Sequence, residues 1–225
     1  MNIVLFGATG MIGQGVLREC LLDSDVDRVL SIGRTKTGQQ HPALRELVHD
    51  NFVDFSSIES ELAGYDACFF CLGVSSAGMS EEAYRRITYD FTLAAARALA
   101  RTSPALTFIY VSGAGTDSTE HGRVMWARVK GATENALHRV GFRAVYSFRP
   151  GYIQPMDGIT SRTGWYRAMY TVGAPLYPLF KALAPRYVTT TEAMGRAMIN
   201  VARHGWSKPV LESPDINSAA DKSTA

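Results

Sequence analysis

The feature that most constrains this chain is a glycine-rich turn that follows an apolar run over residues 1–6. Three glycines, Gly7, Gly10 and Gly13, have the spacing G-x-x-G-x-x-G and lead into an amphipathic stretch. Between a strand and a helix, the first glycine permits a tight turn and the second lets the backbone approach a pyrophosphate. The third allows the helix to pack closely on the strand. The pattern predicts dinucleotide binding at a helix N-terminus, although glycines at this spacing also form structural turns. The turn residues expected to contact the cofactor are Gly7, Thr9, Gly10, Met11, Ile12 and Gly13.

The composition favours one compact domain that needs no disulfide or metal to hold it together. The chain has 225 residues, of which 46% are hydrophobic. Cys20, Cys68 and Cys71 lie in apolar surroundings and are expected to be reduced, packed thiols, which favours a cytoplasmic location. No apolar run reaches membrane-spanning length, and no metal-ligand spacing occurs. The net charge of +2 with both signs scattered gives no electrostatic case for nucleic acid.

Strand-like and helix-like runs alternate along the chain. The strand-like runs are continuously apolar instead of alternating, which is typical of a parallel sheet covered on both faces. After the run at 1–6, the expected strands are 28–32, a third that starts with 46–49, and then 67–72, 106–111 and 144–148. The expected helices are 11–22, 80–101 and 122–139, followed by 189–202 with Thr190 or Thr191 at its start. The fold class is therefore α/β, a doubly wound parallel (Rossmann) sheet with a small C-terminal lobe.

Four segments follow from this reading. Residues 1–155 form the dinucleotide-binding domain and 156–186 a small aromatic-rich lobe or lid. Residues 187–216 return to the main domain, and 217–225 read as a polar tail.

The residues after each strand should lie at the ligand edge of the sheet. Arg34 and Lys36 follow the second strand, about where an NAD-preferring protein would carry an acidic residue. A guanidinium can grip a 2′-phosphate and stack on adenine, so these cations favour NADP(H) over NAD(H), unless they are simply a solvated pair. After the third strand, Asp54 and Phe55 could flank the adenine. After the fourth, Cys71, Leu72 and Gly73 offer small residues and backbone amides to the middle of the cofactor.

These motifs recur in the same order in a known group. They are the glycine turn, Arg34, Asp54-Phe55, Cys71-Leu72-Gly73, Val111-Ser112, Val129-Lys130-Gly131 and Phe148-Arg149-Pro150-Gly151. Over about residues 1–155 the chain resembles an atypical short-chain dehydrogenase/reductase of the NAD(P)H-binding branch that includes NmrA-like and Tat-interacting-protein-like members. The resemblance implies catalytic positions at Ser112 and Lys130, contact of Lys130 with the nicotinamide ribose, and cofactor contacts at Pro150 and Gly151.

One position departs from that pattern. Trp126 stands four residues before Lys130, where catalytic members of the family have Tyr. A phenol near a lysine can relay a proton, whereas an indole N–H donates a hydrogen bond without ionising in the useful range. Tyr152, just after Gly151, is the nearest candidate for a replacement acid, and Ser112 could instead cap the turn that follows it.

The segment 163–184 is rich in aromatic residues and broken by glycine and proline. It could form an apolar substrate pocket, pack as short helices on the main domain, or, as a third reading, present a peripheral membrane face. Two functions remain open. One is an NADP-dependent reductase or epimerase acting on a hydrophobic carbonyl or a sugar nucleotide. The other is a non-catalytic NADPH-binding protein that senses redox state or binds a regulatory partner, which the missing Tyr favours.

Overall fold

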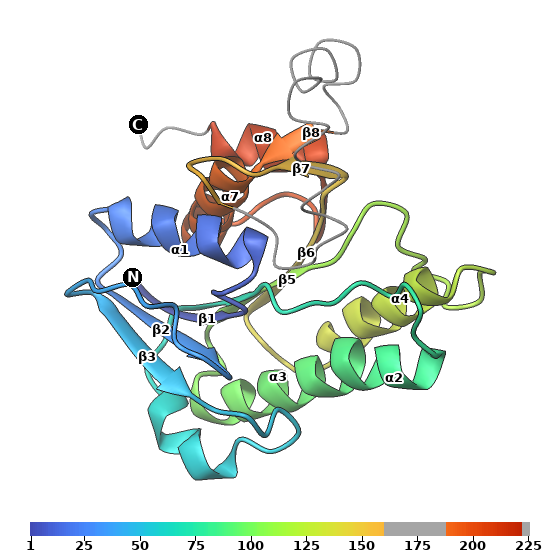
Figure 1. Cartoon of the computed structure of the whole chain (residues 1–225), viewed down its shortest axis with the longest axis horizontal. Helices are drawn as coiled ribbons and strands as arrows, with labels where there is room; N and C mark the ends of the chain where they lie inside the picture. The colour runs from blue at the N-terminus through green and yellow to red at the C-terminus, as the bar shows by residue number, and fades with distance from the viewer. Residues whose placement is uncertain (160–187, 222–225) are drawn as a thin grey trace.

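The computed structural model describes residues 1–159 and 188–221. These residues form a seven-stranded parallel sheet with helices on both faces (Figure 1). The strand order is β3-β2-β1-β4-β5-β6-β9, and every neighbouring pair is parallel. The predicted doubly wound sheet is confirmed.

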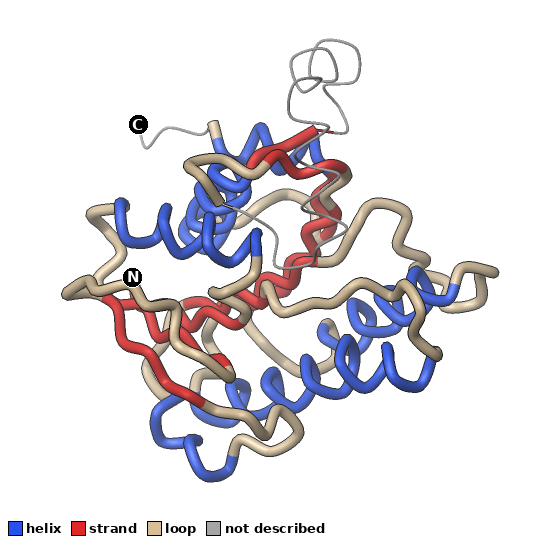
Figure 2. The backbone as a smooth tube through the Cα atoms, in the orientation of Figure 1, coloured by secondary structure: helices blue, strands red, loops and turns tan. Residues whose placement is uncertain are grey.

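The strands of this sheet are short and are separated mostly by helices (Figure 2). They are β1 (Asn2–Phe6), β2 (Arg28–Gly33), β3 (Leu44–Val48), β4 (Ala67–Phe70), β5 (Thr107–Val111), β6 (Ala144–Arg149) and β9 (Val210–Glu212). A separate parallel pair consists of β7 (Tyr152–Gln154) and β8 (Val188–Thr190). The helical segments are α1 (Met11–Leu22), the 3₁₀ helix η1 (Ser56–Leu62), α2 (Glu81–Arg85), the π-helix η2 (Arg86–Asp90), α3 (Phe91–Thr102), α4 (Met125–Leu137), α7 (Thr191–His204) and α8 (Ser213–Ala220).

Each central strand buries both of its faces. In β1, Ile3 and Leu5 pack into a core shared with α1 and α7, whereas Val4 and Phe6 pack into a second core shared with α3 and α4. All four side chains are fully buried. This two-sided burial explains why the strands read as unbroken apolar runs, since neither face has to be polar.

The order of the strands reverses at β1, which pairs with β2 on one side and with β4 on the other. The connections that leave β1 and β4 therefore diverge to opposite halves of the sheet. In such sheets a crevice opens beyond the carboxyl ends of the strands at this point. Figure 1 shows α1 beginning directly after β1 at this edge.

The predicted helices agree well with the observed ones. The segment 11–22 is α1, and 122–139 contains α4. The segment 80–101 consists of α2, η2 and α3 in direct succession. The last predicted helix is α7, and Thr190 caps it because its hydroxyl accepts a hydrogen bond from the Ala193 N–H at 3.0 Å.

Two features of the C-terminal part correct the sequence analysis. The predicted polar tail from Asn217 is wrong for residues 217–220, which form the end of α8 with Ala219 and Ala220 buried. The strands β7, β8 and β9 were not predicted, because three residues are too few to show a period. Most of the predicted lobe at 156–186 falls within 160–187, outside the described residues.

Candidate functional site

A cleft of about 700 Å³ lies at the carboxyl ends of the central strands. Residues that follow β1, β2, β3, β4, β5 and β6 line it, at the edge where the strand order reverses. The predicted residues that line the cleft are Gly7, Thr9, Gly10, Met11, Ile12, Arg34, Cys71, Leu72, Gly73, Ser112, Lys130, Pro150 and Gly151. The predicted residues that do not line it are Gly13, Lys36, Asp54, Phe55 and Tyr152.

The cleft is also lined by residues that the sequence analysis did not predict. They are Asp50, Phe52, Val74, Ser75, Ile87, Phe91, Val111 and Ile153. Asp50 and Phe52 follow the end of β3 almost directly, so a better estimate of that strand end would have found them. Ile87 lies on η2 and Phe91 at the start of α3, so neither follows a strand in the sequence. No pattern of neighbouring residues marks them as part of the cleft.

The glycine turn after β1 brings a helix N-terminus to the cleft. Gly7 has φ +82°, and a Cβ there would lie 2.6 Å from the backbone nitrogen of Leu72. The Gly10 N–H donates to the Gly7 carbonyl at 2.9 Å, and the first helical bond runs from the Gln14 N–H to the Gly10 carbonyl. Gly10 caps α1 without a side-chain hydrogen bond, and the first turn of α1 has no acidic residue. The backbone N–H groups of this first turn are therefore available to an anion.

Gly13 has a packing role instead of lining the cleft. A Cβ at this position would lie 2.0 Å from the carbonyl oxygen of Gly7. A Cβ at Gly10 would meet only that same oxygen, at 3.3 Å, because Gly10 faces the open cleft. The second glycine thus leaves room for a ligand, and the third lets α1 sit against the turn.

Arg34 lies at another part of the cleft, just beyond β2. Its side chain is exposed and lines the cleft, and among the described residues it forms no ion pair. Lys36 is also exposed but lies outside the lining. One unpaired guanidinium is therefore positioned to meet a ligand here.

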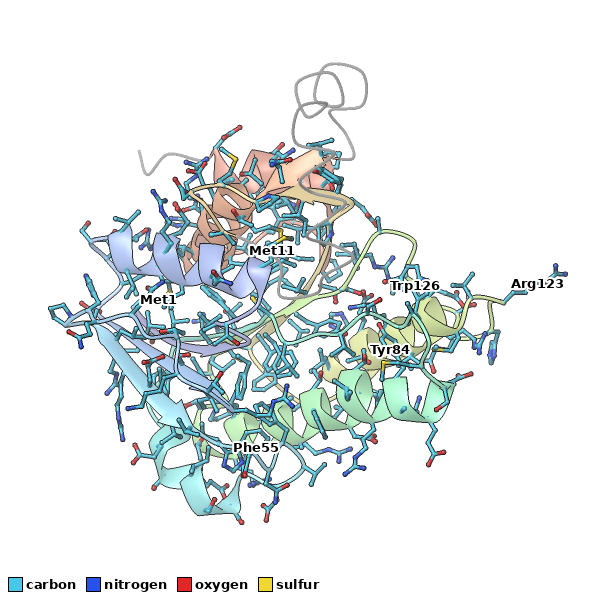
Figure 3. All side chains as sticks on the ribbon, viewed as in Figure 1. Met1, Met11, Phe55, Tyr84, Arg123 and Trp126 are labelled. Carbon is cyan, nitrogen blue, oxygen red and sulfur yellow. The ribbon has the colours of Figure 1, made fainter. Side chains whose placement is uncertain are left out.

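Asp54 and Phe55 differ from their predicted placement beside the cleft. The Asp54 carboxylate accepts hydrogen bonds from the Ser56 backbone N–H and hydroxyl, at 2.9 and 3.0 Å. These bonds hold the pKa of Asp54 below its usual value. Phe55 is buried edge-to-face against Phe6, with ring centroids 5.9 Å apart, in the core on the opposite side of the sheet from Met11 (Figure 3). The turn after β3 brings Asp50 to the cleft instead.

The segment after β4 forms the middle of the cleft wall. Cys71, Leu72 and Gly73 all line it, as predicted, and a Cβ on Gly73 would meet no atom within 4 Å. Burial raises the pKa of the Cys71 thiol well above its usual value, so this sulfur is neutral. Cys20, Cys68 and Cys71 are all free thiols, as the sequence predicted.

Ser112 lies directly after β5 and is buried in the cleft wall. Its Oγ lies 2.9 Å from the Thr116 Oγ1, and the Thr116 hydroxyl donates to the Gly113 carbonyl at 2.7 Å. Because a hydroxyl has one proton, Ser112 must donate to Thr116 in this arrangement. Ser112 therefore both faces the cleft and ties together the turn that follows β5.

Lys130 reaches the cleft from α4. Its Nζ donates to the Val111 carbonyl at 3.3 Å and lies 5.2 Å from the ring centroid of Tyr110. Burial lowers the pKa of Lys130 to about 8, and the nearby Glu134 carboxylate opposes that shift. Glu134 is itself buried and forms an ion pair with Arg149.

Trp126 lies near the start of α4 (Figure 3), one turn before Lys130. It is not among the residues that line the cleft. Its ring faces the turn after β5, because Cβ atoms built on Gly113 and Gly115 would lie 4.0 and 3.7 Å from it. The indole therefore packs against backbone beside the cleft.

Tyr152 is not brought to the cleft. It begins β7, and its hydroxyl donates a hydrogen bond to the Gln154 Oε1 at 2.9 Å. This placement does not support the hypothesis that Tyr152 replaces the missing acid.

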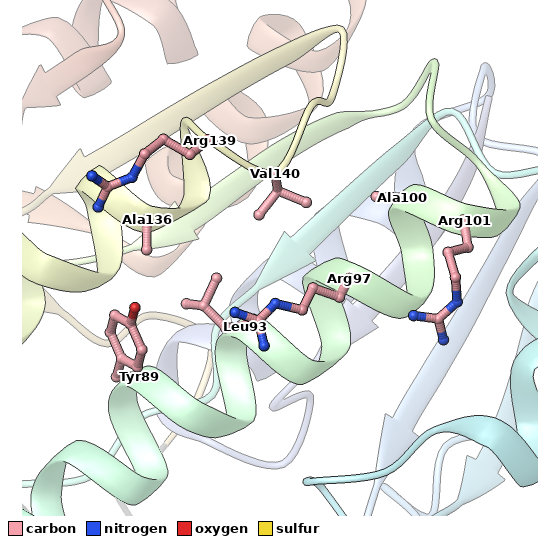
Figure 4. Close-up of a pocket in the computed structure, with 8 residues that line it drawn as sticks. All are labelled: Tyr89, Leu93, Arg97, Ala100, Arg101, Ala136, Arg139 and Val140. Carbon is pink, nitrogen blue, oxygen red and sulfur yellow. The ribbon is translucent and has the colours of Figure 1, made fainter.

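A second groove of about 700 Å³ lies between α3 and α4 and shares no residue with the cleft (Figure 4). Leu93, Ala100, Ala136 and Val140 contribute apolar side chains, and Arg97, Arg101 and Arg139 line it with Tyr89. Within 1–159 and 188–221, no helix is long and apolar enough to cross a membrane, and no three His, Cys, Asp or Glu residues are grouped as metal ligands would be.

Comparison with proteins of known sequence finds relatives across most of the chain. The rat protein HTATIP2 is 27% identical over 202 residues, which cover 88% of this chain and 80% of that protein. The protein FMP52-2, mitochondrial, of Scheffersomyces stipitis is 29% identical over 231 residues, covering 97% of this chain and 93% of the relative. No family model matches the chain.

Comparison with solved structures finds the same fold. The Bordetella bronchiseptica enzyme WbmF in complex with NAD+ aligns with a TM-score of 0.68 at 15% identity, over 97% of this chain and 76% of the enzyme. The UDP-N-acetylglucosamine 4-epimerase of Methanobrevibacter ruminantium aligns with a TM-score of 0.69 at 15% identity, over 94% and 75%. An oxidoreductase of the short-chain dehydrogenase/reductase family from Burkholderia thailandensis has a TM-score of 0.66 at 16% identity, over 97% and 92%.

The sheet, the glycine turn and the cleft at the reversal of strand order define a doubly wound Rossmann fold. Within that class, the relatives in sequence and the neighbours in structure confirm the resemblance predicted from the motifs. The chain resembles the atypical short-chain dehydrogenases/reductases.

Proposed function

We propose that the protein binds NADP(H) in the cleft and reduces a carbonyl compound, or epimerises a sugar nucleotide by the related redox chemistry. The observation that carries the proposal is that three features line one continuous cleft. They are a helix N-terminus with no side-chain cap, the guanidinium of Arg34, which forms no ion pair among the described residues, and Ser112 with Lys130. A dinucleotide needs an anion site for its pyrophosphate and a reaction site at its nicotinamide end. These residues supply both.

The residues present fit the cofactor at its phosphate groups. The first turn of α1 would hold the pyrophosphate beside Gly10. The space that a Cβ on Gly10 would fill is open to a ligand, because only the Gly7 oxygen lies near it. Arg34 would bind the 2′-phosphate of NADP(H), because a guanidinium can form paired, charge-assisted hydrogen bonds with a phosphate. Asp50 and Phe52 line the cleft and would lie beside the adenine, where the sequence analysis expected Asp54 and Phe55.

The other end of the cleft would receive the nicotinamide. Pro150, Gly151 and Ile153 line it there, and Lys130 would contact the ribose. When bound, the cofactor supplies a hydride to the substrate or accepts one from it. Ser112 would orient a carbonyl group if its proton turned from Thr116 to the substrate.

The substrate class is proposed from the chemistry of the cleft and from the structural neighbours. Apolar side chains of Ile87, Phe91 and Val111 share the lining with the polar groups, which suits a hydrophobic carbonyl. Two neighbours support a sugar nucleotide as the alternative, because WbmF was solved with NAD+ and UDP and the 4-epimerase with UDP-N-acetylmuramic acid.

A second candidate function is a non-catalytic NADPH-binding protein that senses redox state or binds a regulatory partner. Trp126 favours it, because the indole cannot take over the proton transfer of a phenol and packs outside the cleft. A cytoplasmic location remains part of the proposal, whereas the fungal relatives are named as mitochondrial.

Substitution of Arg34 tests the cofactor assignment. Arg34→Ala should weaken NADPH binding about 10–150-fold, the equivalent of about 1.5–3 kcal/mol for hydrogen bonds to a charged group, and should change NADH binding little. The matched control is Lys36→Ala, which removes the same charge two residues later, outside the cleft. Calorimetric titration of each variant with both cofactors gives the comparison. Equal losses for the two variants, or for the two cofactors, would reject the assignment.

A further inference from the structure

The cleft needs a proton donor if it reduces a carbonyl, and its lining offers few. Among the lining residues within the described chain, the side chains that could carry a transferable proton on a charged or weakly acidic group are Arg34, Asp50, Cys71 and Lys130. A guanidinium does not release its proton in proteins, and Asp50 lies with Phe52 in the turn after β3, away from Ser112 in the strand order. The Cys71 thiol holds its proton, since burial raises its pKa. Lys130 remains.

The position of Lys130 suits proton transfer at the Ser112 end of the cleft. Its Nζ donates to the carbonyl of Val111, the residue directly before Ser112, at 3.3 Å. An ammonium group has three N–H donors, and this contact uses one of them. Ser112 directs its own proton to Thr116 at 2.9 Å, so it is already engaged within the turn.

We infer that Lys130 itself donates the proton to the substrate oxygen, in place of the phenol that is missing at Trp126. The inference rests on the proposed reductase function. When bound, a reduced nicotinamide would supply a hydride that forms a C–H bond at the carbonyl carbon, and the π electron pair would move to the oxygen. The oxygen takes a proton from the Lys130 Nζ, which becomes a neutral amine. The products are an alcohol and the oxidised cofactor, and solvent returns the proton to Lys130.

The surroundings of Lys130 make this exchange feasible near neutral pH. Burial lowers its pKa to about 8, close to the range in which general acids work best. The groups that face it are the Tyr110 ring from β5, whose pKa burial raises so that it stays neutral, and Glu134 on α4. Arg149 from β6 pairs with Glu134 and so limits the pull of that carboxylate on the ammonium.

Two measurements test this inference: the titration of the Lys130 side chain by NMR, and the pH dependence of the reduction rate. In protein labelled with ¹³C-lysine and saturated with NADP+, the Lys130 ε-carbon, assigned by its loss in Lys130→Arg, should titrate with a midpoint near pH 8. With NADPH bound and 4-nitrobenzaldehyde as the probe, the single-turnover rate of reduction should fall about tenfold per pH unit above that midpoint. Lys130→Arg keeps the positive charge but holds its proton, so the rate should fall about 100-fold while NADPH affinity changes only a few-fold.

The outcomes separate this inference from the proposed function. Failure of the wild-type protein to bind either cofactor would reject the proposed function. Normal NADPH binding with no reduction of the probe would count against the reductase function and the inference together, and would favour the non-catalytic candidate. Reduction of the probe with a Lys130 midpoint above pH 10, with a rate that Lys130→Arg leaves intact, or with a rate lost in Tyr152→Phe instead would overturn the inference alone and leave the proposed function standing.

Discussion

The glycine-turn end of the cleft and its Ser112 end are built from different parts of the chain. At the first end, the groups offered to a ligand are backbone N–H groups of α1, held in place by Gly7, Gly10 and Gly13. At the second end they are side chains, those of Ser112 and Lys130, with Trp126 packed beside them. The site at the glycine turn depends on glycines, whose missing side chains leave room for a ligand beside the backbone N–H groups. The site at Ser112 and Lys130 depends on which side chains carry a transferable proton.

This difference separates binding from chemistry. A backbone anion site survives most substitutions of side chains, because its donors are common to all residues. A proton-transfer site can lose its function with one residue while the cofactor still binds. The protein therefore has a structural basis for binding that is independent of how, or whether, it turns over.

The largest expected effect is at the backbone end. Gly10→Val should lower the affinity for either dinucleotide at least about 100-fold, since its side chain would enter the space through which the pyrophosphate reaches the N–H groups. Gly10 has φ −81°, which Val adopts without strain, so the thermal transition should stay within a few degrees of wild type. Titration with NADPH and a melting curve measure the two quantities.

Gly13→Ala is the matched control at the same turn. Its Cβ would stand 2.0 Å from the Gly7 oxygen, so it should destabilise the fold by about 3 kcal/mol or more. Normal NADPH binding by Gly10→Val would contradict a ligand-facing role for Gly10. A wild-type melting temperature in both variants would contradict a packing role for Gly13.

The next effect concerns stability at the side-chain end. Lys130 has a pKa of about 8 in the folded protein against 10.5 as its ordinary value, so the folded state binds fewer protons between these limits. Wild-type stability should therefore rise from pH 8 to pH 10.5. Lys130→Met removes the cost of burying the charge and should be more stable than wild type by about 1–3 kcal/mol at pH 7.

Urea unfolding at pH 7 and pH 10.5 measures this difference. The advantage of Lys130→Met should be present at the lower pH and absent at the higher one. A variant that is less stable than wild type at pH 7 would show that the ammonium contributes to folding instead of opposing it.

The smallest expected effect is at Trp126. Trp126→Tyr places an ionisable hydroxyl one helical turn from Lys130 and should raise the rate of 4-nitrobenzaldehyde reduction about tenfold, less than the full range of general acid catalysis because Lys130 already donates. Trp126→Phe is the control for the change in size and should leave the rate within about threefold. Equal gains in both variants would mean that space, and not the phenol, limits the reaction.

The same division explains what could be predicted from the sequence. The glycine turn, α1 and Arg34 follow from local spacing, and the structure brings them to one cleft. Asp54 was placed beside the cleft, but its carboxylate bonds to Ser56 within its own loop, and the turn after β3 brings Asp50 to the cleft instead. Tyr152 is the nearest candidate acid in the sequence, but it does not line the cleft, and its hydroxyl donates to the Gln154 Oε1 instead.

The central claim is that the cleft binds NADP(H), with Arg34 on the 2′-phosphate, and isothermal titration of the wild-type protein with NADPH and NADH tests it most directly. The two cofactors share every contact that the backbone end can make and differ by the one phosphate that Arg34 would meet. The account predicts one site and an affinity for NADPH at least about tenfold higher than for NADH, the lower bound set by a charge-assisted hydrogen bond. Equal affinities, tighter binding of NADH, or no binding of either cofactor would contradict it.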